Sequence, residues 1–319
     1  MLSRVADSLY WMSRYLERAE HTARLVNVNL YLTLDRTPVD AARHWGRLLA
    51  SLRMPPPMAT AANVAAEATG QVLDLANRDS IAACISAARE NARQVREQIS
   101  SEMWQQINRQ FLAVRRDAPD PGWTSRTHEF LMSVIEGVHL FQGITNATMT
   151  HGEGWHFIEL GRYIERASAT AALLDVQYRD FSGAATAPST VGEYVEWVGL
   201  LRSCCAFEAY CRHYTADIRP DRIAEFLLLN AQFPRSVRYA ARHIQSSLQA
   251  IGQQNGRAAG RAQRLAGRLL ASLDYGQVDE ILSDNLQAYL EAIVRQANQI
   301  NVAINQQYVQ YPVDEALSA

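Results

Sequence analysis

The stretch RYLERAEHTARL, from Arg14 to Leu25, has a near copy later in the chain, RYIERASATAAL, from Arg162 to Leu173. The two stretches share Arg, Tyr, Glu, Arg, Ala, Thr, Ala and Leu at matching positions, 148 residues apart. Each lies within an apolar pattern of period 3.6, which predicts a helix. The chain therefore carries the same Glu-Arg pattern at the same register in two predicted helices.

A weaker echo has almost the same offset. Arg89 and Arg96 match Arg235 and Arg242, 146 residues apart. Two echoes with nearly equal offsets predict an internal duplication. We expect halves of about 1–150 and 151–310 in a single domain, 1–310, followed by a C-terminal tail, 311–319. A duplicated helical unit usually packs about a pseudo-two-fold axis, so the two Glu-Arg helices are expected to be neighbours.

The rest of the chain is also helical in pattern. Apolar residues recur with a helical period in nearly every long segment, and alternating β-branched runs are missing. The sequence therefore predicts an all-α fold, a bundle of many helices. Besides the helix that carries the first Glu-Arg stretch, helices are expected at 40–53, 60–76, 80–117, 124–149, 153–180, 190–217, 220–230, 235–254, 258–274 and 280–308.

Composition limits the classes of function. The 319 residues have 48% hydrophobic and 20% charged side chains and a net charge of −2, which favours a globular protein that binds neither nucleic acid nor a membrane. The N-terminus lacks the apolar run of a secretory signal, which favours the cytoplasm. All 31 basic residues are arginine, so lysine-dependent catalysis and a P-loop are excluded.

The charged residues of the two repeated stretches, which we call the Glu-Arg stripe, have three interpretations. It forms a solvated helix face, an internal lattice of ion pairs, or a pocket for an anionic ligand. In the lattice, we expect Arg14 to meet Glu165 and Glu17 to meet Arg162. In the pocket, the surplus arginines bind a carboxylate or phosphate; the candidates are Arg14, Arg18, Arg162 and Arg166.

Two further segments carry arginines that are candidates to converge on this stripe. Arg89, Arg93 and Arg96 lie in a charge-dense stretch, and Arg235 and Arg238 follow Pro234 at a predicted helix start. His151 and His156 match no zinc motif, and the Glu-x-x-His pattern of di-iron bundles is not repeated. We therefore expect no metal and no cofactor.

Four segments together resemble the alpha-E domain family, bacterial all-helical proteins with a Glu-Arg motif. They are SLYWMSRYLERAEHTARLV (8–26), ARENARQVREQISSEMWQQIN (88–108), GEGWHFIELGRYIERASATAALL (152–174) and FLLLNAQFPRSVRYA (226–240). The resemblance implies a genomic context, since such proteins are typically encoded beside or fused to a circularly permuted ATP-grasp protein, with transglutaminase-like peptidases nearby. That context implies a bacterial system that makes or modifies peptides by ATP-driven amide-bond formation.

Three functions are open at this point. In the first, the bundle is an accessory protein that binds an ATP-grasp-type amide ligase or presents its peptide substrate. In the second, it is an enzyme in the same pathway that acts on a peptide or amino-acid-derived carboxylate, with Glu17, Glu165 or His21 as the catalytic candidates. Nearby arginines are expected to lower the pKa of the glutamates and so weaken them as bases. In the third, it is a non-catalytic scaffold or a homodimeric interaction module, and a homo-oligomer is the possible assembly.

Overall fold

The structure is a computed structural model that describes residues 1–34, 36–58, 60, 63–117, 126–181, 190–254 and 260–309. Within these ranges the elements are helices joined by turns, and no strand is present. The predicted all-α class is confirmed. The predicted tail, 311–319, lies outside the described residues.

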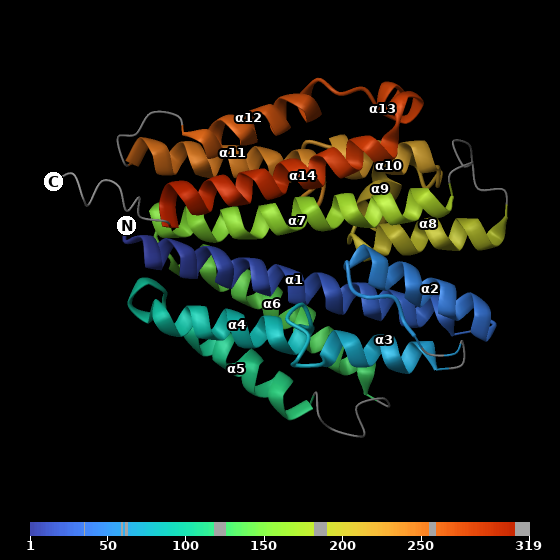
Figure 1. The fold of residues 1–319 in the computed structure, drawn as a ribbon, viewed down its shortest axis with the longest axis horizontal. Coiled ribbons are helices and arrows are strands. Elements are labelled where there is room, and N and C mark those ends of the chain that lie inside the picture. Colours follow the sequence, from blue (N-terminus) through green and yellow to red (C-terminus); the bar gives the residue numbers. More distant parts are fainter. Residues whose placement is uncertain are drawn as a thin grey trace.

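Two long helices run side by side through the middle of the molecule, α1 (Ser3–Thr33) and α7 (Glu153–Asp180) (Figure 1). They point in the same direction, because the Met1 ammonium group lies 2.9 Å from the Glu153 carboxylate at their shared N-terminal end. Their backbones approach closely at Gly161, where a Cβ atom would overlap the carbonyl oxygen of Tyr10. These two helices carry the two Glu-Arg stretches, so the expectation that the stretches are neighbours is confirmed.

Each long helix packs against two helices that are joined by a third. α1 packs against α4 and α6, and α5 packs against both of these; α7 packs against α11 and α14, and α12 packs against both of these. Figure 1 shows the first set on one side of the central pair and the second set on the other. The same order of neighbours in both halves is what a duplication predicts, and the duplication itself stays a prediction. The bounds are α4 (Ile81–Gln94), α5 (Ser101–Asp117), α6 (Thr127–Thr148), α11 (Val237–Gln254), α12 (Arg261–Asp274) and α14 (Leu286–Ile304).

Shorter helices gather toward the C-terminal ends of α1 and α7 (Figure 1). They are α2 (Pro38–Ser51), α3 (Val64–Leu73), α8 (Val191–Ser203), α9 (Phe207–Tyr214), α10 (Pro220–Leu229) and α13 (Val278–Asp284). A 3₁₀ turn, η1 (Arg96–Gln98), follows α4, and a π-helical turn, η3 (Asn305–Val309), follows α14. No described helix is both long enough and apolar enough to cross a membrane.

Three predicted helices are interrupted in the structure, namely those at 80–117, 190–217 and 280–308. The first stops before Ser100, whose hydroxyl accepts a hydrogen bond from the backbone of the new helix α5. The second stops at Cys205, whose φ of 52° is left-handed. The third is divided by Asn285, whose side chain caps α14. Side chains that bond to the backbone compete with a continuing helix, which periodicity alone does not reveal.

Candidate functional site

The carboxylate of Glu17 is buried between α1 and α7 and is bound on both oxygens. Arg166 donates from Nε to Oε1 at 2.6 Å and from Nη2 to Oε2 at 2.9 Å. Gln142 of α6 donates to Oε2 at 3.2 Å, and Nη1 of Arg235 lies 3.6 Å from Oε1. Glu17 therefore has no oxygen free for a substrate.

Glu165, the matching residue of α7, is bound in the same way by two arginines of α1. Arg18 donates from Nε to Oε1 at 2.6 Å and from Nη2 to Oε2 at 3.1 Å. Arg14 donates to Oε2 from Nε at 2.9 Å and from Nη2 at 2.7 Å. Both motif glutamates are therefore held in two-pronged ion pairs, the strong geometry for arginine and carboxylate.

These contacts determine the protonation of the two carboxylates. Burial is the largest influence on the pKa of Glu165 and favours the neutral acid, but Arg14 and Arg18 outweigh it and lower the pKa to about 2. Burial likewise opposes ionisation of Glu17, yet Arg166 and Arg235 lower its pKa. Both glutamates are ionised at neutral pH and are weak bases, in agreement with the sequence-based expectation.

The ion pairs follow the repeat with one exception. The pair of Glu17 with Arg166 is mirrored by the pair of Glu165 with Arg18. The predicted contact of Arg14 with Glu165 is present, but the predicted contact of Glu17 with Arg162 is wrong.

The exception has a local cause. Arg162 binds Glu159, one turn earlier in α7, at 2.7 Å. The position of Glu159 is occupied in α1 by Trp11, which offers no carboxylate. Arg14 instead lies with its guanidinium 4.7 Å from the centre of the Trp11 ring and reaches across to Glu165. One difference between the two copies thus redirects an arginine.

A third buried glutamate, Glu20, was missed by the sequence analysis. Its side chain is fully buried, and it accepts from Arg235 at 2.7 Å and from Arg24, with His139 at 3.4 Å. Burial opposes its ionisation, but Arg235, His139 and Arg24 hold its pKa well below the usual range. The spacing of Glu20 and Arg24, four residues apart on α1, was the available signal.

The other candidate arginines are only partly brought to this centre. Arg235, which precedes α11, is buried and bridges Glu17 and Glu20. Arg238 does not take part, because it binds Asp274 of α12 at 2.6 Å. The prediction that this segment converges on the Glu-Arg centre is therefore confirmed for Arg235 and wrong for Arg238.

The arginines of α4 and η1 lie elsewhere. Arg89 donates to Asn108 at 2.8 Å and stacks on Phe111. Arg96 lies over the ring of Trp104, 4.8 Å from its centre. Arg93 forms an exposed pair with Glu90, which precedes it on α4. None of these three arginines contacts Glu17 or Glu165 in the described part of the chain, so the predicted convergence of this segment is wrong.

His21 lies on α1 beside the ion pairs and is buried. Burial, followed by the charge of Arg235, lowers its pKa to about 4, so the imidazole is neutral at pH 7. Its Nε2 atom has no hydrogen-bond partner among the described residues. His21 lines a cleft of about 210 Å³ together with Arg18, Asp79 and Glu165. A pKa this low makes His21 a poor general base.

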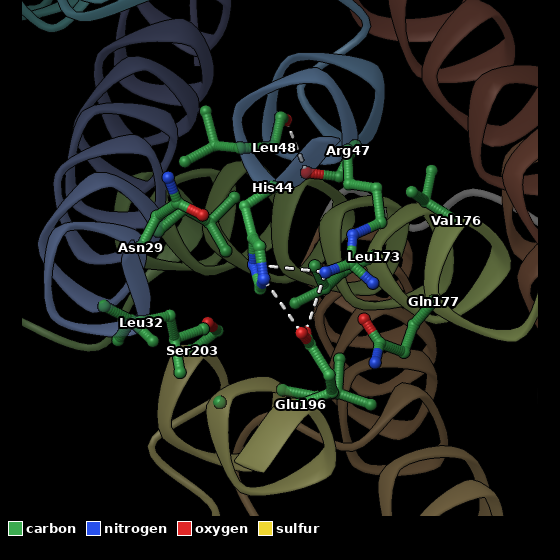
Figure 2. A pocket seen from close by; sticks show the side chains of 15 residues that line it. Asn29, Leu32, His44, Arg47, Leu48, Leu173, Val176, Gln177, Glu196 and Ser203 are labelled. Carbon is green, nitrogen blue, oxygen red and sulfur yellow. Dashed lines mark hydrogen bonds and ion pairs between the residues drawn. The ribbon is translucent and has the colours of Figure 1, made fainter. Parts of the chain in front are cut away.

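A second charged cluster connects α2 to α8 (Figure 2). Glu196 accepts from His44 Nε2 at 2.9 Å and from Arg47 at 2.7 Å, and Arg47 also lies 3.1 Å from His44 Nδ1. Because both imidazole nitrogens are engaged, His44 is not free to act as a base. The cluster borders a cavity of about 50 Å³, where the buried amide nitrogens of Asn29 and Gln177 have no partner within the described ranges. Sequence reasoning did not identify these residues, since no motif joins them.

The histidines considered for metal binding have other neighbours. His151 stacks on Trp155 with ring centres 4.3 Å apart, and its Nε2 lies 3.1 Å from the carbonyl oxygen of Asn146. Over the part of the chain that the structure describes, no group of three or more His, Cys, Asp or Glu residues is placed to hold a metal ion.

The fold and the buried ion pairs define a class: an all-α bundle in which Glu-Arg motifs of two parallel helices bind each other. Residues 1–309 match the Alpha-E family, described as a predicted alpha-helical domain with a conserved ER motif. The chain belongs to that family. The chain contains the dipeptide Glu-Arg at Glu17-Arg18 and again at Glu165-Arg166.

Relatives are found in mycobacteria. Uncharacterized proteins of Mycobacterium bovis and Mycobacterium tuberculosis are each 24% identical to this chain over 320 residues. The matched region covers 91% of this chain and 35% of each relative, so the chain spans about a third of their length. No solved structure matches this chain.

Proposed function

We propose that this chain is a non-catalytic helical partner of an ATP-grasp-type amide ligase in a bacterial peptide synthesis or modification system. The observation that carries the proposal is the saturation of Glu17 and Glu165 by arginines inside the bundle. The motif carboxylates hold the two halves together, and neither of them is available as a general base. We infer that the protein acts by binding a partner and not by catalysis.

Two further points support a partner role. In the mycobacterial relatives, the matched region is about a third of a longer chain, so the helical unit there is part of a larger polypeptide. The choice of an ATP-grasp ligase as the partner comes from the resemblance carried by the four sequence motifs. The absence of lysine agrees with it, because a chain without a P-loop lysine is poorly equipped to bind ATP by itself.

The test is co-expression with the ATP-grasp protein encoded by the same genome. We expect the two proteins to co-purify in a fixed ratio and the ligase to gain activity when the helical protein is added. The matched control is the same ligase with an unrelated helical bundle of similar charge. Full ligase activity without this protein, together with no complex on size-exclusion chromatography, would overturn the proposal.

The two other functions predict different results. An enzyme that uses Glu17 or Glu165 as its base requires the double variant Glu17→Gln, Glu165→Gln to fold normally while the pathway stops. The buried ion pairs instead predict that this variant unfolds more readily. A homo-oligomeric scaffold predicts a self-associated protein by light scattering and no complex with the ligase.

A further inference from the structure

The cleft beside His21 is built from four separate parts of the chain. Arg18, His21 and Thr22 come from α1, and Glu165 comes from α7. The end of α2 and the turn before α4 complete it. At about 210 Å³ it is smaller than the roughly 300–1,000 Å³ of pockets for drug-sized ligands, so its size suits a small molecule such as an amino acid.

Arg53, on the rim of this cleft, has an unusual backbone. It follows the last turn of α2 with a φ of 57°, a left-handed conformation in which glycine is preferred because it has no Cβ. Its side chain is exposed and forms no ion pair or hydrogen bond with any residue that the structure describes. Arg53 therefore places an unpaired guanidinium on the rim of the cleft, at a backbone position where glycine would be less strained.

The two carboxylates that line the cleft are paired with arginines other than Arg53. The carboxylates of Asp79 and Glu165 are both bound by Arg18, and Glu165 is also bound by Arg14. Two arginines therefore balance two carboxylates. The guanidinium of Arg53 takes no part in these pairs, and it suits a ligand with a single negative charge.

The wall of the cleft combines polar and apolar groups. His21 and Thr22 each have a buried polar atom, Nε2 and Oγ1, that lacks a partner in the described ranges. Such atoms are uncommon in folded proteins, and the residues of the described ranges do not satisfy them. Leu52, Ala169 and Ala172 add an apolar wall. The neutral imidazole adds no charge that would alter the preference for a single anion.

We propose that this cleft binds the carboxylate of a small monoanionic ligand, with Arg53 as the charge partner and Leu52, Ala169 and Ala172 against its aliphatic part. The class of ligand is an amino-acid derivative with a free carboxylate and a short apolar side chain. This inference does not depend on the ligase partnership, because the site is formed by this chain alone.

The experiment uses N-acetyl-L-alanine as the probe and N-acetyl-L-alaninamide as its neutral counterpart, titrated into the full chain by calorimetry and NMR. Three variants are compared with the parent: Arg53→Gly, Arg53→Gln and, as the matched control, Arg43→Gln. Arg43 is an exposed arginine of α2 outside the cleft, with 69% of its side chain accessible. We expect saturable binding of the acid, no binding of the amide, and at least about tenfold weaker binding of the acid to both Arg53 variants.

Arg53→Gly separates a ligand role from a structural one. Glycine is favoured at a left-handed position, so this variant should be at least as stable as the parent while its affinity falls. Arg43→Gln should bind the acid as the parent does. The proposal is overturned if the acid does not bind, if the amide binds equally well, or if the Arg53 variants bind the acid as tightly as the parent does.

Discussion

Glu17 and Arg166 form a two-pronged ion pair inside the molecule although 149 residues separate them in the chain. Arg18, the residue after Glu17, binds Glu165, the residue before Arg166. Each Glu-Arg pair therefore faces the other copy, with its acid and its base both bound across the interface of α1 and α7. This reciprocity explains why both residue types occur in both copies, since loss of either leaves a buried charge unpaired.

Replacing Glu17 with glutamine should destabilise the fold. Arg166 would keep its buried charge without the carboxylate that balances it, which typically costs about 3–5 kcal/mol, while Arg235 would keep Glu20 as its partner. Urea unfolding followed by circular dichroism measures the loss. The matched control is Glu90→Gln, which removes the acid of the exposed Arg93 pair and should leave the midpoint unchanged. Equal midpoints for the two variants would contradict the internal role of Glu17.

The two arginines of the second copy should differ in importance. Arg166→Met removes the two-pronged partner of the ionised Glu17 and should lower the free energy of unfolding by about 3–5 kcal/mol. Arg162→Met strands Glu159, whose pKa is already raised by burial despite the neighbouring Arg162, so this carboxyl can take up a proton. The loss of stability at pH 5 should therefore be clearly smaller for Arg162→Met. A larger loss for Arg162→Met would show that the pairing with Glu159 has been misjudged.

The close approach of α1 and α7 predicts the effect of a single methyl group. Gly161→Ala places a Cβ against the carbonyl oxygen of Tyr10, so the helices must separate and the midpoint of thermal unfolding should fall. Gly143→Ala is the control, because no atom lies within 4 Å of the added Cβ in the middle of α6. There alanine should stabilise the helix by roughly 0.5–1 kcal/mol. We therefore expect Gly161→Ala to lower the stability and Gly143→Ala to raise it.

Stability should fall as the pH is lowered, in two stages. The pKa of His21 is about 4 in the fold and about 6.5 when unfolded, so the unfolded chain binds more protons between these values. Folding is therefore weakened as the pH falls from 6.5 to 4, by roughly 3 kcal/mol from this residue. Glu165, with a pKa of about 2, adds a second loss as the pH falls from about 4.5 to 2.

The variant His21→Gln isolates the first stage. Its unfolding free energy should depend less on pH between 6.5 and 4 than that of the parent, while the stage below pH 4.5 should be unchanged. Chemical denaturation at several pH values supplies both curves. Parallel curves over the whole range would rule out a neutral, buried imidazole at this position.

The sequence pattern alone predicted part of the arrangement of helices and ion pairs. Apolar periodicity predicted the helices, and the repeat predicted that Glu165 would meet Arg14. The contact of Glu17 with Arg162 failed because a single difference, Glu159 in place of Trp11, gives Arg162 a nearer carboxylate. A repeat predicts equivalent positions, but the partner of a long side chain depends on every neighbour within its reach.

Other contacts depend on how helices meet in space. Glu196 and His44 come from α8 and α2, and no spacing along the chain indicates that they touch. Arg235 was a candidate ligand-binding residue, yet it lies in the interior because the turn before α11 passes Glu17 and Glu20. Arg53 has no ion-pair partner among the described residues, and its left-handed backbone is a property of the folded chain.

The long separation between the central partners has a consequence for synthesis on the ribosome. Chains emerge N-terminus first, so α1 leaves the tunnel well before its partner arginine, 149 residues further on, has been translated. Arg235 follows later still, 215 residues after Glu20. Until these arginines have been synthesised, the acidic side chains of the nascent α1 are hydrated or covered by a chaperone. The buried ion pairs of α1 can therefore form only after Arg166 and Arg235 have been synthesised.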